Sequence, residues 1–304
     1  MTRADKFADI NVGGWTNAHE EPLGTKPKRW LRDPATKARW LMKDVTFNRR
    51  ADGTLYAKGD DWAERIACAV AHHLELPTAT VELAHFESGA DLTLGVISRS
   101  VVAADESLVH GNELLEEVGV FGADPHDRTG YNLDAVRRSL TNVAAPSDRF
   151  GSAWEAFVGY LILDALIGNT DRHQENWAAI DNAGLRRLAP TFDHASCLGF
   201  QLDDSQRRER LASTDANRGP DAYAARARSR FEGSPVVMTV AIDAFATLPA
   251  PGKGRWADAV GDVDALVGCI ARVPDDRMSE PSREFAEGIL RANQSKMAQT
   301  IVRV

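Results

Sequence analysis

The sequence has 304 residues, of which 43% are hydrophobic and 26% are charged, and its formal net charge is −8. This length is sufficient for two lobes or domains, and the composition is ordinary for a globular protein. The negative charge argues against general nucleic-acid binding, and no apolar run reaches the roughly 20 residues that span a bilayer. We therefore expect neither direct nucleic-acid binding nor a membrane-embedded segment.

Three cysteines, Cys68, Cys197 and Cys269, lie far apart in the sequence and form no Cys-x-x-Cys pair. Their odd number and wide spacing argue against a disulfide framework and against a zinc site. The first residues, MTRADKFADINVGG, lack the basic segment followed by an apolar one that marks a secretory signal. A reducing, cytoplasmic location is therefore expected.

Strand patterns dominate the N-terminal part of the sequence. A short strand is expected near Trp30 and another over residues 38–45, followed by a turn-rich connection. Lys43 lies in the second strand, on the same face as Leu41. A lysine that snorkels to solvent from a strand end is the alternative to a functional role, and this fragment alone does not decide between them.

A helix follows these strands, with Asp60 or Asp61 as its cap and its end at about Leu74. Glu64 lies in the first turns, where a surface acid that suits the helix dipole is the ordinary interpretation. Two further strand patterns come next. Residues 1–103 are therefore predicted to form a small α+β lobe.

Two stretches of the chain are rich in basic residues. Residues 26–50 hold nine basic and two acidic side chains, which suggests that an anionic ligand binds nearby. A solvated basic face is the simpler alternative for this fragment alone. Residues 207–230 hold seven arginines and are expected to form either a mobile substrate-binding loop or an exposed pair of helices.

From residue 104 onward the pattern is helical, and residues 104–304 are predicted to form a larger helical lobe. Its clearest helix begins at a capping box made by Ser152 and Glu155. Apolar residues then recur at helical spacing up to a break at Gly168, where a polar loop begins. The predicted fold class is thus α+β, with a small β-rich lobe and a larger helical one.

The polar loop carries residue types that phosphoryl transfer requires. Asn176 follows Asp171 by five positions, which is the D-x-x-x-x-N spacing of kinase catalytic loops, and Asp193 comes after a hairpin-sized gap. Asp171 can accept a hydroxyl proton, while Asn176 and Asp193 offer the hard oxygen ligands that Mg²⁺ prefers. Lys43 and Glu64, 21 positions apart, complete the set that orients the phosphates of ATP. The pattern predicts an ATP-dependent kinase.

Two alternatives stay open for this loop. Asp171, His173 and Asp193 could ligate a transition metal, or the loop acids and amides could simply turn the backbone. The order of acid, amide, second acid, upstream lysine and helix glutamate disfavours both. His173 is expected to pack under the loop and to orient one of the two acids.

These motifs resemble those of the HipA-like kinases, a family of bacterial toxin kinases. The resemblance rests on GNTDRHQENW (168–177), on LAPTFDHAS (188–196), and on KRWLRDPATKARWLMKD followed by AERIACAVAHHLELPTATVEL, in the family's order. The D-R-H-x-x-N loop is also similar to that of phosphatidylinositol kinases. The loop alone therefore does not choose between lipid and protein acceptors.

The resemblance implies a two-lobed protein-kinase-like fold that uses ATP and Mg²⁺ to phosphorylate a serine or threonine of a protein. Carried over by motif, Asp171 is the catalytic base, and Asn176 and Asp193 are the metal ligands. Lys43 contacts the phosphates, and Glu64 is its ion-pair partner.

The nucleotide loop that the resemblance implies consists of Gly24, Thr25 and Lys26, with a single glycine and no G-x-G-x-x-G pattern. Thr16 and Thr25 are the candidate autophosphorylation sites. Only 42 residues precede Lys43. The chain is therefore expected to be a kinase core of the short or split type, without the additional N-terminal subdomain of longer members.

The family also implies partners. Its longer members phosphorylate aminoacyl-tRNA synthetases and are held by a helix-turn-helix antitoxin, so a translation protein as substrate and such an antitoxin are expectations for this chain. A lipid or small-molecule kinase is the alternative within the same class. A nucleotide-binding regulator without turnover is the alternative from another class, motivated by the reduced glycine loop.

Overall fold

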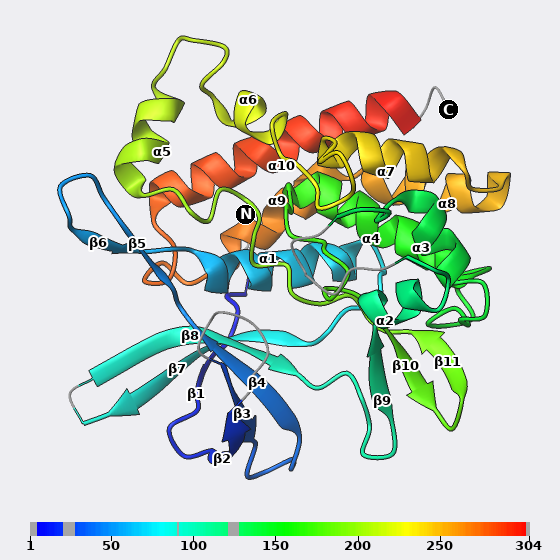
Figure 1. The fold of residues 1–304 in the computed structure, drawn as a ribbon. Coiled ribbons are helices and arrows are strands. Elements are labelled where there is room, and N and C mark those ends of the chain that lie inside the picture. Colours follow the sequence, from blue (N-terminus) through cyan, green and yellow to red (C-terminus); the bar gives the residue numbers. More distant parts are fainter. Residues whose placement is uncertain (1–4, 21–27, 90, 121–127, 302–304) are drawn as a thin grey trace.

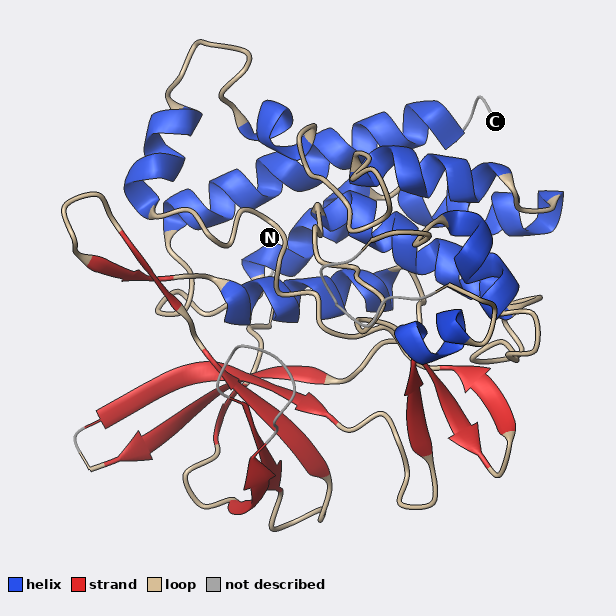
Figure 2. Cartoon of the chain, viewed as in Figure 1, coloured by secondary structure: helices blue, strands red, loops and turns tan. Residues whose placement is uncertain are grey.

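The computed structural model describes residues 5–20, 28–89, 91–120 and 128–301. Figure 1 shows most strands at one end of the molecule and most helices at the other. Figure 2 shows a second, smaller group of strands beside the first. This arrangement confirms the predicted α+β class. The division of the chain after residue 103 stays a prediction.

The larger sheet has six strands in the order β1-β7-β8-β4-β3-β2. Adjacent strands in this sheet are antiparallel, except β1 and β7, which run parallel. Lys43 is flanked in register by Lys28 on β3 and Val96 on β8, so it lies within the sheet and not at an edge. The strands are β1 (Asp9–Asn11), β2 (Thr16–Glu20), β3 (Lys28–Arg32), β4 (Arg39–Asp44), β7 (Val81–Ser88) and β8 (Asp91–Arg99). A separate hairpin is formed by β5 (Phe47–Arg49) and β6 (Leu55–Ala57).

Helix α1 (Asp60–His73) lies between the large sheet and the other helices (Figure 1). Its N-cap is Gly59, which makes no side-chain cap. The prediction that Asp60 or Asp61 caps the helix is therefore wrong. Both acids lie in the first turn instead, where a negative charge suits the positive end of the helix dipole.

Helix α4 (Ala153–Ile167) is buried along all 15 of its residues and forms the centre of the helical region. Ser152 caps it by accepting a hydrogen bond from Glu155 N, as predicted. The Glu155 carboxylate accepts from Gly151 N, so the reciprocal half of the capping box is absent between these two residues. Gly168, with a φ of 67°, ends the helix in the left-handed conformation that glycine adopts without strain.

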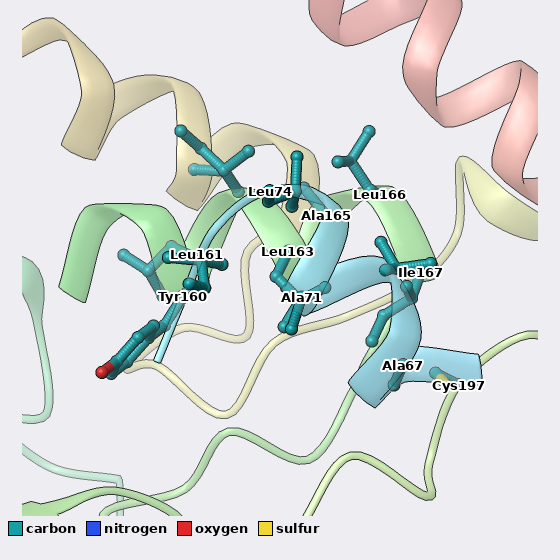
Figure 3. Close-up of a cluster of buried hydrophobic side chains, with 14 of the residues drawn as sticks. Ala67, Ala71, Leu74, Tyr160, Leu161, Leu163, Ala165, Leu166, Ile167 and Cys197 are labelled. Atoms are coloured by element: carbon teal, nitrogen blue, oxygen red, sulfur yellow. The ribbon is translucent and has the colours of Figure 1, made fainter. Parts of the chain in front are cut away.

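The core between α1 and α4 connects the sheet to the polar loop that follows Gly168. Figure 3 shows Ala67 and Ala71 of α1 in one cluster with Leu163 and Ile167 of α4, together with Cys197. Small side chains on α1 allow the two helices to pack closely. This packing positions α1 relative to the loop that leaves α4.

The helical region contains three strands that form a second sheet, in which β9 (Ser107–His110) pairs with β10 (Ala178–Asn182) and β10 pairs with β11 (Leu185–Leu188). The expectation that the chain stays helical from about residue 104 is wrong at β9. Four residues are too few to show a strand period, and their partner lies some seventy positions away. The hairpin expected before Asp193 is present as β10 and β11.

The arginine-rich stretch of residues 207–230 includes most of α5 (Asp204–Leu211) and all of α6 (Pro220–Ala224), which matches one of its two alternatives. Helix α9 (Val263–Ala271) begins after Gly261, where Asp262 caps it by accepting a hydrogen bond from Ala265 N. Among the described helices, none is both long and apolar enough to cross a membrane. The remaining described helices are α2 (Gly111–Glu116), α3 (Leu133–Ser139), α7 (Val237–Ala246), α8 (Ala250–Val260) and α10 (Glu280–Ile301).

Candidate active site

Lys43 joins two acids from distant parts of the chain. Its Nζ atom lies 3.0 Å from Oε1 of Glu64 on α1 and 2.9 Å from Oδ1 of Asp193, which follows β11. The Lys43 and Glu64 side chains are 9% and 1% exposed, so water screens their interaction only weakly. This burial overturns the alternative in which Lys43 snorkels to solvent.

Burial and charge act on Lys43 in opposite directions. Burial alone lowers the pKa of the Lys43 ammonium group, but the negative charges of Asp193 and Glu64 outweigh it and raise this pKa well above its ordinary value. Lys43 therefore stays protonated at neutral pH. A permanent positive charge is what a residue in contact with phosphate oxygens requires.

Asp193 has a left-handed backbone conformation, with a φ of 59°, which is uncommon for residues other than glycine. Such conformations persist where the surrounding structure holds them, and they cluster at functional sites. The next residue, His194, is buried, and its Nε2 atom lies 2.7 Å from Oγ1 of Thr191. This hydrogen bond anchors the segment that presents Asp193.

A buried ion pair between Arg172 and Asp164 joins the polar loop to α4. The Arg172 guanidinium group donates to both carboxylate oxygens of Asp164 on α4, at 2.8 and 2.9 Å, and to the backbone O of Asn176 at 2.7 Å. Asn169 Nδ2 also donates to Asp164 Oδ1. This pair was not predicted from the sequence, although a lone aspartate inside the apolar run LILDALI is a signal for a buried, paired charge.

The loop presents Asp171 and Asn176 next to each other. Asn176 Nδ2 donates to the backbone O of Asp171 at 2.8 Å, which orients the amide group. The Asp171 carboxylate is 30% exposed, and its Oδ1 atom lies 2.7 Å from Arg230. Ser196 Oγ lies 3.5 Å from Asp171 Oδ2. Arg230 was not singled out from the sequence, where it is one arginine among seven in its stretch.

The segment that carries Asp193 runs alongside the polar loop of Asp171 and Asn176. Thr170 N donates to Ser196 O at 3.2 Å, and Leu198 N donates to Ile167 O at 3.0 Å. These backbone bonds connect the end of α4 and the loop after it to the chain just beyond Asp193. The two parts of the predicted metal site are thus held side by side.

The donor chemistry at this place suits Mg²⁺. Asp193 offers a carboxylate and Asn176 an amide oxygen, and Mg²⁺ completes such sets with phosphate oxygens and water. Within the described ranges, no group of three or more His, Cys, Asp or Glu side chains is arranged to hold a metal ion. His173 N donates to the backbone O of Asp171 at 2.8 Å, and its Nδ1 atom accepts from Glu175 N at 3.2 Å. The expectation that the His173 ring orients one of the two acids stays a prediction.

Five of the eight predicted site residues lie at this one location in the structure. The other three, Gly24, Thr25 and Lys26, lie outside the described residues. The five are Lys43, Glu64, Asp171, Asn176 and Asp193.

A sheet with a buried lysine–glutamate pair, next to a helical region with a D-x-x-x-x-N loop and a following acid, defines a protein-kinase-like fold. Residues 21–246 of the chain match the HipA-like C-terminal domain family. The chain therefore belongs to this family, and the resemblance inferred from its motifs is confirmed.

The chain is similar in sequence to a curated kinase. It is 27% identical over 161 residues to the serine/threonine-protein kinase CtkA of Helicobacter pylori (strain J99), an alignment that covers 51% of this chain and 45% of the relative. The chain thus spans about half the length of this curated relative.

Two crystal structures share its fold and confirm the kinase-like architecture. A proinflammatory kinase CtkA of Helicobacter pylori superposes with a TM-score of 0.74 at 19% identity, over 97% of this chain and 96% of that chain. HipA of Shewanella oneidensis MR-1, solved with HipB and operator DNA, gives a TM-score of 0.55 at 12% identity, over 96% and 70% of the two chains.

Proposed function

We propose that this chain is an ATP- and Mg²⁺-dependent kinase that phosphorylates serine or threonine residues of a protein. The observation that carries the proposal is the buried Lys43, which holds Glu64 and Asp193 beside the loop of Asp171 and Asn176. A nucleotide-binding regulator without turnover has no need of a base and two metal ligands in addition to the lysine. The match to a curated serine/threonine-protein kinase supports the same class.

Each residue has a defined task in this proposal. Lys43, oriented by Glu64, would contact the α- and β-phosphates of ATP, and Gly24, Thr25 and Lys26 would form the loop over them. Mg²⁺, when bound, neutralises negative charge on the phosphates. Asp171 would accept a hydrogen bond from the acceptor hydroxyl and take its proton as that oxygen bonds to the γ-phosphorus, while the bond from this phosphorus to the β,γ-bridging oxygen breaks and ADP leaves. The residues that would hold Mg²⁺ are Asn176 and Asp193.

Substitution of the base tests the proposal. Asp171→Asn keeps the size of the side chain but removes its capacity to take a proton, so transfer of labelled γ-phosphate should fall by about 10²- to 10⁴-fold. Thermal unfolding should show that the variant is folded. Asp105→Asn, at an exposed position outside the site, is the matched control and should transfer phosphate as the wild type does. Wild-type transfer by Asp171→Asn would overturn the role of the base.

A lipid or small-molecule acceptor is the second candidate, favoured by the contact of the cationic Arg230 with Asp171. Transfer to cellular protein, to phosphatidylinositol vesicles and to small hydroxyl compounds can be measured in parallel with labelled ATP. Label in protein alone supports the proposal, whereas label in lipid alone supports the alternative.

We also propose a helix-turn-helix antitoxin as partner and a translation protein, such as an aminoacyl-tRNA synthetase, as substrate. The solved complex of the related HipA with HipB supports the first of these. Thr16, exposed on β2, and Thr25 are the proposed autophosphorylation sites. Phosphoproteomics after controlled expression tests substrate and autophosphorylation together.

All three cysteines are buried free thiols, which supports the proposal of a reducing, cytoplasmic location.

A further inference from the structure

A cavity of about 490 Å³ lies beside Asp171 on the side of the helical region. Thr170, Ser196 and Arg230 line it, and the last two lie against the Asp171 carboxylate. Its volume falls within the range of about 300–1,000 Å³ that is typical of ligand pockets. The cavity therefore opens next to the atom that we propose as the base.

The cavity is strongly cationic. The described residues that line it include five arginines and neither aspartate nor glutamate. Arg128 and Arg228 donate to the hydroxyl and backbone oxygens of Ser234, at 2.8 and 3.4 Å. Because these acceptors are neutral, the bonds orient the guanidinium groups without cancelling their charge. The five arginines are Arg128, Arg210, Arg226, Arg228 and Arg230.

A buried hydroxyl group in the cavity wall supports a ligand independently of these charges. Ser229 is 6% exposed and lines the cavity. Across the described part of the chain, its Oγ atom is buried without a hydrogen-bond partner. Leaving a buried hydroxyl unsatisfied is unfavourable, and an acceptor group on a ligand in this cavity would satisfy it.

Arg230 belongs both to the cavity and to the base. Its guanidinium group lies 2.9 and 2.7 Å from Asp171 Oδ1 through two different nitrogen atoms. This contact occupies a carboxylate oxygen of Asp171. That oxygen could otherwise accept a hydrogen bond from the hydroxyl group that is to be phosphorylated. A second carboxylate placed in the cavity would compete for the same guanidinium group.

We propose that the cavity binds an acidic segment of the protein acceptor and that a carboxylate of this segment draws Arg230 away from Asp171. Binding of the correct acceptor then frees the base. This inference rests on the proposed kinase function and specifies the class of its substrate as an acidic polypeptide. Arg230 is a positioning residue in this scheme, because it acts on the reaction through Asp171.

Peptide binding tests the cavity without requiring catalysis. The probes are two fluorescein-labelled peptides, one with a single serine among glutamates and the other with glutamine at each of those positions. Fluorescence anisotropy should show that the acidic peptide binds roughly tenfold more tightly at low salt, and less so at high salt, because several ion pairs act together. Equal affinities would overturn the proposal.

Arginine variants locate the binding site. Arg226→Ala/Arg228→Ala removes two exposed guanidinium groups of the cavity and should abolish most of the preference for the acidic peptide. Arg208→Ala, at a 66% exposed position of α5 outside the cavity, is the matched control and should keep the preference. A preference that survives in the double variant would place the binding site elsewhere. If the double variant does not fold, Ser229→Ala replaces it and should weaken acidic-peptide binding roughly threefold.

Phosphate transfer to the same peptides tests the role of Arg230. In the wild type, kcat should be higher for the acidic peptide than for the glutamine peptide. In Arg230→Gln the two kcat values should become similar, because no guanidinium group covers Asp171 and the acidic peptide is not needed to free it. A kcat ratio unchanged by Arg230→Gln would overturn the coupling to Asp171.

Preferential binding without transfer to either peptide would refute the kinase proposal while leaving the acidic docking site. Binding of phosphatidylinositol phosphate vesicles with no preference between the peptides would replace the polypeptide by a lipid.

Discussion

The charge states of the residues around Asp193 are set by burial together with neighbouring charges. Lys43 stays protonated because two acids outweigh its burial. His194 has the opposite outcome: burial, assisted by the positive charge of Arg172, holds its pKa well below the ordinary value of 6.5. The imidazole is therefore neutral at pH 7 while its Nε2 atom shares a hydrogen bond with Thr191.

This pKa shift predicts a contribution of His194 to the pH dependence of stability. The unfolded chain protonates His194 as the pH falls below 6.5, whereas the folded chain does not, so acid favours the unfolded state. His194→Gln should therefore lose less unfolding free energy than the wild type between about pH 6.5 and about pH 5. Urea unfolding at a series of pH values measures this difference. Parallel pH profiles for the two proteins would contradict the prediction.

At the scale of elements, α4 determines where the loop begins, and its position depends on a close approach to α8. A Cβ atom at Gly159 would lie 2.4 Å from the Trp256 ring and 2.7 Å from Leu76. Trp256 is fully buried, so its ring has little room to move. Glycine at this position lets the two helices touch.

Gly159→Ala should consequently destabilise the protein by about 1–3 kcal/mol, because overpacking outweighs the better helix propensity of alanine. Gly254→Ala in α8 is the matched control. A Cβ atom there meets nothing within 4 Å, so propensity alone acts and stability should rise by up to about 1 kcal/mol. Thermal unfolding of both variants distinguishes packing from propensity. A gain in stability for Gly159→Ala would refute the tight contact.

At the scale of the whole molecule, Arg277 connects the large sheet to the helices. Its side chain is 1% exposed and lies 2.8 Å from Asp61 on α1 and 2.6 Å from Asp9 on β1. It also donates to the backbone oxygens of Ala84 and Gly95, at 3.3 and 2.7 Å. Burial raises the pKa of Asp61, and the positive charge of Arg277 opposes that rise. One side chain thus satisfies acceptors from four elements.

Arg277→Met should cost about 3–5 kcal/mol of unfolding free energy, because it leaves the Asp61 carboxylate buried without its cation. Adding Asp61→Asn should recover part of this loss, which a double-mutant cycle measures. Arg291→Met, at a 46% exposed position of α10, is the control and should change stability by less than about 1 kcal/mol. A similar loss in both single variants would argue against a specific role of the buried arginine.

Local spacing in the sequence was sufficient to predict the strand of Lys43, helix α1 and the spacing between Asp171 and Asn176 in the loop. These features depend on turn chemistry and on periods of two or 3.6 residues, which act over a few positions. The order of the motifs was sufficient for the family. The short strand β9 was not predictable in this way, because its pairing with β10 supplies most of its stability.

Apart from the pair of Lys43 and Glu64, which the family resemblance implies, the tertiary structure alone decided which charges meet. Lys43 reaches Asp193 across 150 positions, Arg230 reaches Asp171 across 59, and Arg277 reaches Asp61 across 216. A charged residue in a sequence has many candidate partners, and its partner is determined only when core packing brings two elements together. The residues of the polar loop, and the chemistry that we propose for them, therefore follow from the sequence. The arginine that covers the proposed base, and the cationic cavity beside it, follow only from the fold.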